Sequence, residues 1–229
     1  TIPEGKDIRF IARTIKFKLP IDTAQFAKAI KDSALCEQLG IHANSLFGYL
    51  MPNTYFLDPG MSERDIIRVM VKEFRNFFDA ELQKRTEQMN FTPHQIVTLA
   101  SIIESETAED DERYYVSAVY HNRLKKNMLL QADPTIQFII PDGPRRLYHK
   151  DLEMNNPYNT YKFKSLPPGP INNPGKASIL AALYPASVDY LYMVADGSGK
   201  HIFSKSLAEH RKAKNQLDKL RRNLKRSRD

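Results

Sequence analysis

The segment LASIIESET, residues 99–107, carries the side chains whose types and spacing best suit chemistry in this sequence. Glu104 and Glu106 follow a run of apolar residues, so Glu104 is expected where the helix is still packed. Burial disfavours the charged form of a carboxylate and so favours the protonated form that a general acid uses. The alternative is that the helix reaches the surface here and that water solvates both glutamates. The residues alone leave both interpretations open.

Four short segments downstream combine amide, hydroxyl and aromatic side chains. Such a mixture suits a glycan, because sugar hydroxyls need hydrogen-bond partners and the faces of sugar rings stack on aromatic rings. Each segment alone is more typical of a turn, but together they predict one groove that contains the Glu104 side chain. The segments are YHNRL at 120–124, LQADPT at 130–135, PYNTY at 157–161 and LPPGPINNPG at 166–175.

Other site chemistries find little support in the sequence. The six His residues show no HExxH pattern, and Cys36 is the only cysteine, so we expect no metal site and no disulfide. GxSxG, P-loop and GxGxxG patterns are absent, and we expect no cofactor. The DGSG segment at 196–199 is better explained as a hairpin turn.

The helix that would position Glu104 has a clear beginning. Thr92 is a typical N-cap, Pro93 suits the first helical position, and Gln95 stands three residues after the cap. Apolar residues surround the helix that follows, which indicates burial on all sides. Neighbouring helices are expected from Asp110 or Asp111 to Lys126, and from a start at Asn173-Pro174-Gly175 to about Leu183.

Helical periodicity and turn residues predict the remaining elements. We expect a short N-terminal strand with a turn at Glu4-Gly5, an extended connector or strand, an ordered but irregular stretch, and a hairpin before a basic helix. The expected ranges are a helix containing Ile8 to Ile15, helices at 24–35 and 62–89, the connector at 45–58, the irregular stretch at 127–173, strands at 190–195 and 201–204, and the basic helix from 207.

The net charge of +7 points to an anionic partner, but most of the excess lies after Glu209. We interpret this tail as a solvated amphipathic helix, with contact to an anionic polymer or lipid as the second interpretation. A nucleic-acid partner is not expected, because the rest of the chain lacks a basic stripe interleaved with aromatics. No apolar run approaches the roughly 20 residues of a membrane span. Since the sequence starts at Thr1, we expect a mature product or a chain trimmed of an N-terminal anchor.

In their order, these motifs resemble the MltG (YceG-like) family of endolytic murein transglycosylases. The resemblance covers roughly residues 45–210, and TIPEGKDIRFIA resembles the start of the family's small LysM-like subdomain. It is carried by LASIIESET, YHNRL, LLQADPTIQF, PYNTY, LPPGPINNPGKASILAALYPA and DYLYMVADGSGKHIFSKSLAEH. Two positions depart from the family pattern, since Phe47 and Asn53 stand where the family often has acidic residues.

The resemblance implies that Glu104 is the catalytic glutamate, with Glu106 as the second choice. Glu104 would protonate the oxygen between N-acetylmuramic acid and N-acetylglucosamine, and would then accept the proton of the C6 hydroxyl that closes a 1,6-anhydro ring. The alternatives are a hydrolytic muramidase, whose second carboxylate would be Glu106, Asp133 or another carboxylate, and a non-catalytic glycan-binding or scaffolding protein of the division machinery. Candidates for holding the glycan are Asn122, Gln131, Asp133, Tyr158, Asn159, Tyr161 and Asn173.

The expected fold is α+β, with a LysM-like module at residues 1–43 and a catalytic domain of helices around a small sheet at 44–229. The resemblance also implies a bacterial protein held in the inner membrane by one N-terminal helix, with its catalytic part in the periplasm. Its partners would be the glycan strands of peptidoglycan and peptidoglycan synthases.

Overall fold

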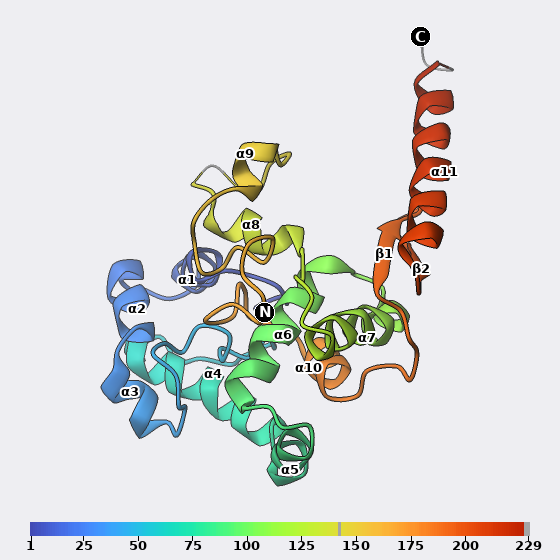
Figure 1. Ribbon diagram of the computed structural model, residues 1–229. Helices are drawn as coiled ribbons and strands as arrows, with labels where there is room; N and C mark the ends of the chain where they lie inside the picture. Colours follow the sequence, from blue (N-terminus) through green and yellow to red (C-terminus); the bar gives the residue numbers. More distant parts are fainter. Residues whose placement is uncertain (142, 227–229) are drawn as a thin grey trace.

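The computed structural model describes residues 1–141 and 143–226 and has an α+β fold dominated by helices (Figure 1). Within the described residues, the only named strands form a two-stranded antiparallel hairpin. The elements are α1 (Ile8–Lys16), α2 (Thr23–Ile30), α3 (Ser33–Gln38), α4 (Glu63–Phe77), α5 (Ala80–Gln88), α6 (Pro93–Glu106), α7 (Asp110–Lys125), α8 (Asp133–Ile139), α9 (His149–Leu152), α10 (Lys176–Leu183), β1 (Tyr192–Ala195), β2 (His201–Ser204) and α11 (Leu207–Arg226).

Helix α6 lies in the middle of the molecule and packs against α5, α7, α8 and α10. Its beginning confirms the predicted capping box, in which the Thr92 side chain accepts from the Gln95 N–H and the Gln95 side chain accepts from the Thr92 N–H. All eight residues from Ile96 to Ile103 are buried, as the apolar pattern indicates. The end of α6, which carries Glu104, is therefore fixed by packing on several sides.

Two helices expected from the sequence are each a pair of shorter helices. The range 24–35 contains parts of α2 and α3, and the range 62–89 contains α4 and α5. Asp32 and Asp79 cause the breaks, because each side chain accepts hydrogen bonds from two backbone N–H groups of the helix that follows. The single-helix predictions were wrong because each expected range runs across one of these N-cap residues.

One hydrophobic core extends from Ile2 to Leu183, so the N-terminal helices share it with α6 and α10. The expected N-terminal strand is reduced to isolated bridges, which pair Ile2 with Asn53 and Lys6 with Asn173. The connector at 45–58 likewise forms no named strand beyond that bridge. These bridges hold the turn at Glu4-Gly5 against the segment before α10.

The stretch 127–173 is irregular apart from α8 and α9. The predicted hairpin is confirmed, with Tyr192 opposite Ser204 and Ala195 opposite His201. Helix α11 packs against this hairpin and extends away from the other helices (Figure 1). The last residues of the basic tail, 227–229, lie outside the described residues. Among the described helices, none is both long and apolar enough to span a membrane.

Candidate active site

Glu104 lies in the last turn of α6 and only 7% of its side chain is exposed. Its Oε2 atom accepts a hydrogen bond of 3.0 Å from the backbone N–H of Gly175, the residue before α10. A guanidinium nitrogen of Arg113 lies 3.4 Å from the same oxygen. The packed glutamate expected from the sequence is found, and a cation and a backbone donor compensate its charge.

Arg113 is itself buried and has further partners. It donates a 2.6 Å hydrogen bond to the Ser178 hydroxyl of α10 and forms a 2.9 Å ion pair with Asp110. Because α6, α7 and α10 each contribute to this network, the position of the Glu104 carboxylate depends on three helices. A site of this kind is preorganised rather than assembled by a flexible loop.

A second carboxylate, that of Glu4, reaches the same place from the N-terminal segment. A Cβ atom built on Gly175 would lie 2.7 Å from Glu4 Oε2, so the carboxylate fills the space where a side chain would be. Its neighbour Gly5 packs against Glu104, because a Cβ at Gly5 would lie 3.4 Å from Glu104 Cγ. Burial raises the pKa of Glu4, and the negative charge of Glu104 raises it further against the opposing charge of Arg113.

No motif marks Glu4 in the sequence as a functional residue. The only available signal is the pair of glycines at 5 and 175, because a glycine is required where another group approaches the backbone closely. That signal identifies close approach but does not say which group approaches. The contact between Glu4 and Gly175 therefore becomes visible only in the folded chain.

Glu106 has different surroundings from Glu104, although both belong to the end of α6. Tyr120 donates a 2.5 Å hydrogen bond to Glu106. Burial raises the pKa of Glu106 to about 7, against the opposing effect of the Tyr120 hydrogen bond. The nearby charges are those of Asp133 in α8, His201 in β2 and Arg123 in α7.

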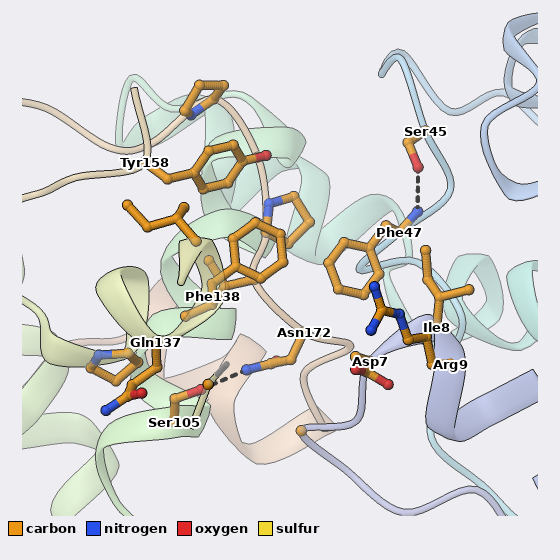
Figure 2. A pocket seen from close by; sticks show the side chains of 18 of the residues that line it. Asp7, Ile8, Arg9, Ser45, Phe47, Ser105, Gln137, Phe138, Tyr158 and Asn172 are labelled. Carbon is orange, nitrogen blue, oxygen red and sulfur yellow. Dashed lines mark hydrogen bonds between the residues drawn. The ribbon is translucent and has the colours of Figure 1, made fainter. Parts of the chain in front are cut away.

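Between these two glutamates, Ser105 lines a cleft of about 1060 Å³ (Figure 2). Among the described residues, neither Glu104 nor Glu106 lines this cleft, but Gly5, which packs against Glu104, does. Ser105 also accepts a 2.7 Å hydrogen bond from Asn172. Glu104 therefore lies directly behind the cleft wall made by residues 5 and 105.

One side of the cleft is aromatic. The rings of Phe47 and Phe138 are stacked with centroids 6.1 Å apart, and Phe138 contacts the Tyr158 ring at 4.9 Å. Phe47, which departs from the family pattern, thus belongs to this aromatic wall. The cleft is also lined by Asp7 and Arg9 at the start of α1, which lie beside Phe47 in Figure 2, and by Lys31 at the end of α2.

Three of the four polar clusters predicted to share one groove do line the cleft, but the Glu104 side chain, which was predicted to lie in that groove, does not line it. They contribute Pro134, Tyr158 and the range 168–172, together with Gln137 and Phe138 of α8. The prediction was wrong for the YHNRL cluster, because Asn122 donates its hydrogen bonds to the carbonyls of Val188 and Tyr190.

Several other candidate residues use their side chains within the protein. Asn159 donates to the carbonyls of Leu152 and Met154, and Tyr161 donates a short hydrogen bond to Asp133. Gln131 has an exposed side chain and a positive φ of 51°.

Asn173 is fully buried and connects the N-terminal segment to the site. Its side chain accepts from the N–H groups of Gly48 and Leu50 and donates to the carbonyl of Lys6. These three hydrogen bonds hold the backbone next to Glu4 and Gly5. Among the described residues, no cluster of three His, Cys, Asp or Glu could hold a metal ion.

Comparison with known proteins gives consistent matches over most of the chain. A model of the YceG-like family matches residues 1–216. A protein named endolytic murein transglycosylase from Bacillus subtilis (strain 168) is 37% identical over 229 residues, covering 93% of this chain and 63% of that protein. One of the same name from Streptococcus pneumoniae serotype 2 is 27% identical over 239 residues, covering 92% and 43%. The chain thus spans less than two thirds of either curated relative.

A solved structure supports the same family assignment. A Listeria monocytogenes protein described as YceG-like has a TM-score of 0.83 and 37% sequence identity to this chain. The match covers 92% of this chain and 74% of that one. At this identity and score, the two proteins share the fold over most of this chain.

Proposed function

The chain belongs to the YceG-like family, and we propose that it cleaves the glycan strands of peptidoglycan as an endolytic lytic transglycosylase. The names of the two curated relatives support this reaction. The observation that carries it here is the buried Glu104 carboxylate, held by the Gly175 N–H and by Arg113 behind the wall of a large cleft.

Glu104 is the proton-transfer residue of this mechanism. Its protonated carboxyl gives a proton to the glycosidic oxygen between N-acetylmuramic acid and N-acetylglucosamine while the bond from that oxygen to C1 breaks. The C6 hydroxyl of the same muramic acid attacks C1, and Glu104 takes up the hydroxyl proton. One carboxylate serves both steps because the substrate supplies its own tethered nucleophile.

The cleft offers the surfaces that such a glycan needs. Phe47, Phe138 and Tyr158 present ring faces on which sugar rings stack, and the lining also includes the cations Arg9 and Lys31. Carboxylates of the muramic acid or of its peptide stem would face those cations. The candidate glycan contacts remain Tyr158 in the cleft and, as proposals, Asn122, Gln131, Asp133, Asn159, Tyr161 and Asn173.

A LysM-like module is the best description of the N-terminal part. The order of elements supports this description. Ile2 forms a β-bridge with Asn53, and helices α1 and α2 lie between these two residues in the sequence. That bridge favours a boundary after residue 53, later than the 43 expected from the sequence. With the boundary expected from the sequence, residues 44–229 form the catalytic part. In either division the module supplies Glu4 and Gly5 to the site.

The setting of the enzyme follows from the family resemblance alone. It implies anchoring in the inner membrane by an N-terminal helix, a catalytic part in the periplasm, and work alongside peptidoglycan synthases. These remain proposals that co-purification with membranes and with synthases from cells would test.

Product analysis tests the reaction. Purified protein should release fragments from peptidoglycan that end in 1,6-anhydromuramic acid, and digestion in oxygen-18 water should leave those ends unlabelled. Glu104→Gln keeps the shape of the side chain but cannot relay a proton, so cleavage should fall by at least about a hundredfold. Labelled reducing ends would establish a hydrolytic muramidase instead, and no cleavage at all would leave a glycan-binding scaffold. Near-normal activity of Glu104→Gln would move the catalytic role to Glu106.

A further inference from the structure

Ser105 lies between Glu104 and Glu106 on α6, and its exposed side chain lines the cleft (Figure 2). Its Oγ atom lies 2.7 Å from Nδ2 of Asn172, and the same Nδ2 atom donates a 2.8 Å hydrogen bond to the carbonyl of Ser101. Because a carbonyl only accepts hydrogen bonds, this second contact identifies the group that faces α6 as the NH2 group of the amide. Ser105 therefore accepts from Asn172, and its own hydroxyl proton remains to be donated elsewhere.

The other hydroxyl groups near this part of α6 give their protons to the protein. Thr98 donates to the carbonyl of His94, and Ser101 donates to the carbonyl of Thr98. A serine within a helix can donate to the carbonyl four residues earlier, yet among the described residues no acceptor takes the Ser105 proton. The Ser105 hydroxyl is thus an unused donor in the cleft wall, one residue after Glu104.

Other polar side chains of the cleft lining already have partners. The Gln137 amide forms hydrogen bonds with both the N–H and the carbonyl of Arg145. The Ser45 hydroxyl donates to the carbonyl of Ile30. Ser105 differs from these residues because its donor is left for a ligand.

The amide oxygen of Asn172 is a second unusual feature of this wall. Asn172 is only 4% exposed, and its Oδ1 atom has no hydrogen-bond partner among the described residues. A buried acceptor without a partner lowers the stability of the fold, so stability alone does not explain an amide at this position. Its NH2 group, in contrast, holds the Ser105 hydroxyl as an acceptor and so leaves the Ser105 proton for the cleft.

A donor of this kind selects a group that accepts hydrogen bonds. On a chain of N-acetylated sugars, the carbonyl oxygen of the 2-acetamido group accepts and cannot donate, whereas each sugar hydroxyl can do both. Carboxylates of the substrate are matched instead by the cations Arg9 and Lys31 of the same lining. Pro134 and Phe138 also line the cleft, and their apolar surface suits the methyl group of an acetamido substituent.

We propose that Ser105 is a specificity-determining residue that donates a hydrogen bond to the carbonyl oxygen of a 2-acetamido group on the bound glycan; this rests on the proposed function. Asn172 acts through Ser105 by holding its hydroxyl. Because Ser105 follows Glu104 directly, the recognised acetamido group belongs to a sugar beside the cleaved bond. Ser105 takes no part in proton transfer, which stays with Glu104.

The test compares kcat/KM on N-acetylated glycan strands with kcat/KM on strands from which the acetyl groups have been removed. The wild type should prefer the acetylated strands, and Ser105→Ala should reduce that preference by about 2–10-fold, because one hydrogen bond to the carbonyl is lost. Ser105→Thr keeps a hydroxyl and should restore most of the preference. Strands deacetylated only at glucosamine or only at muramic acid identify the sugar that Ser105 contacts.

Ser187→Ala is the matched control. Ser187 is an exposed serine that, among the described residues, neither lines the cleft nor makes a hydrogen bond. Its preference for acetylated strands should equal that of the wild type. Thermal unfolding midpoints of the variants show that each is folded, and alanine at the exposed position 105 suits a helix.

The outcomes separate this inference from the proposed function. An unchanged preference in Ser105→Ala, with an active wild type and an inactive Glu104→Gln, overturns the role of Ser105 and leaves the transglycosylase intact. An equal loss of kcat/KM on acetylated and deacetylated strands also overturns it, because the serine would then support the Glu104 site without recognising the acetyl group. A wild type that releases no anhydro ends overturns the proposed function and this inference with it.

Discussion

Tyr120 donates a 2.5 Å hydrogen bond to Glu106, and this contact gives Glu106 surroundings different from those of Glu104, although only Ser105 lies between them on α6. Glu104 has a cation and a backbone donor beside it, whereas Glu106 has a buried phenol. Two glutamates of one short motif thus have opposite electrostatic surroundings. Substitution of Glu104 should therefore change mainly the activity, whereas substitution of Glu106 should change mainly the stability of the fold.

Glu106 should make the folded protein less stable as the pH rises. Burial raises its folded pKa to about 7 from 4.5, so the folded state binds this proton more tightly than the unfolded state. The stabilisation is full below pH 4.5 and is lost as the pH rises through 7. It amounts to about 3 kcal/mol, since each pKa unit corresponds to about 1.4 kcal/mol.

Urea unfolding of the wild type and of Glu106→Gln at pH 5 and pH 8 measures this effect. The wild type should lose more free energy of unfolding between these two values than the variant, which has no carboxyl to ionise. Equal losses in both proteins would mean that Glu106 is not the buried acid that its surroundings indicate.

Gly175→Ala should disturb the site without unfolding the chain. The φ of Gly175 is −79°, which alanine adopts readily. The new methyl group would overlap the Glu4 carboxylate and push it away from Glu104. We expect a several-fold loss of glycan cleavage, because the displaced carboxylate no longer packs beside the Glu104 site.

Gly60→Ala is the matched control, because a Cβ at position 60 meets no atom within 4 Å. Its activity and unfolding midpoint should equal those of the wild type. If Gly175→Ala also kept the activity of the wild type, the close contact between Glu4 and Gly175 would not contribute to glycan cleavage.

Asn173→Ala should destabilise the fold by about 2–4 kcal/mol, because it leaves buried backbone groups of Gly48, Leu50 and Lys6 without their partner. Asn44→Ala removes an exposed amide instead and should change the free energy of unfolding by less than about 0.5 kcal/mol. Denaturant unfolding monitored by circular dichroism compares the two. Similar stability of both variants would show that the buried amide can be replaced by water.

Local signals in the sequence predicted the helix that carries Glu104 well. The capping box at Thr92 and the apolar circumference of α6 involve only neighbouring residues, and both are found. The breaks at Asp32 and Asp79 also depend on local sequence, but a continuous helix was predicted at each. Aspartate occurs both as an exposed residue within a helix and as an N-cap. Local sequence alone could not choose between those two uses.

Contacts between distant segments could not be predicted in the same way. An asparagine looks alike in sequence whether it binds a sugar or a backbone carbonyl, and Asn122, Asn159 and Asn173 all use their side chains on backbone groups. The meeting of Glu4 with Gly175 depends on how the N-terminal turn packs against the segment before α10. Only tertiary packing decides such pairings.

The aromatic wall of the cleft should contribute to glycan affinity more than to the chemical step. Phe138 has its ring between those of Phe47 and Tyr158, yet 41% of the residue is exposed and free to contact a ligand. Loss of one stacking ring weakens the binding free energy by about 0.5–1.5 kcal/mol, in addition to the effect of the lost buried area. Phe138→Ala should therefore raise KM for soluble glycan strands by about 2–10-fold with little change in kcat.

Phe56→Ala provides the control for this substitution, because Phe56 is an equally large aromatic residue that is 99% exposed. Its KM should match the wild type, since it does not line the cleft among the described residues. A loss in kcat with unchanged KM for Phe138→Ala would contradict the stacking role, because it would place the ring in the transition state instead of in glycan binding. An equal rise in KM for both variants would indicate that exposed aromatic surface, not this cleft, holds the glycan.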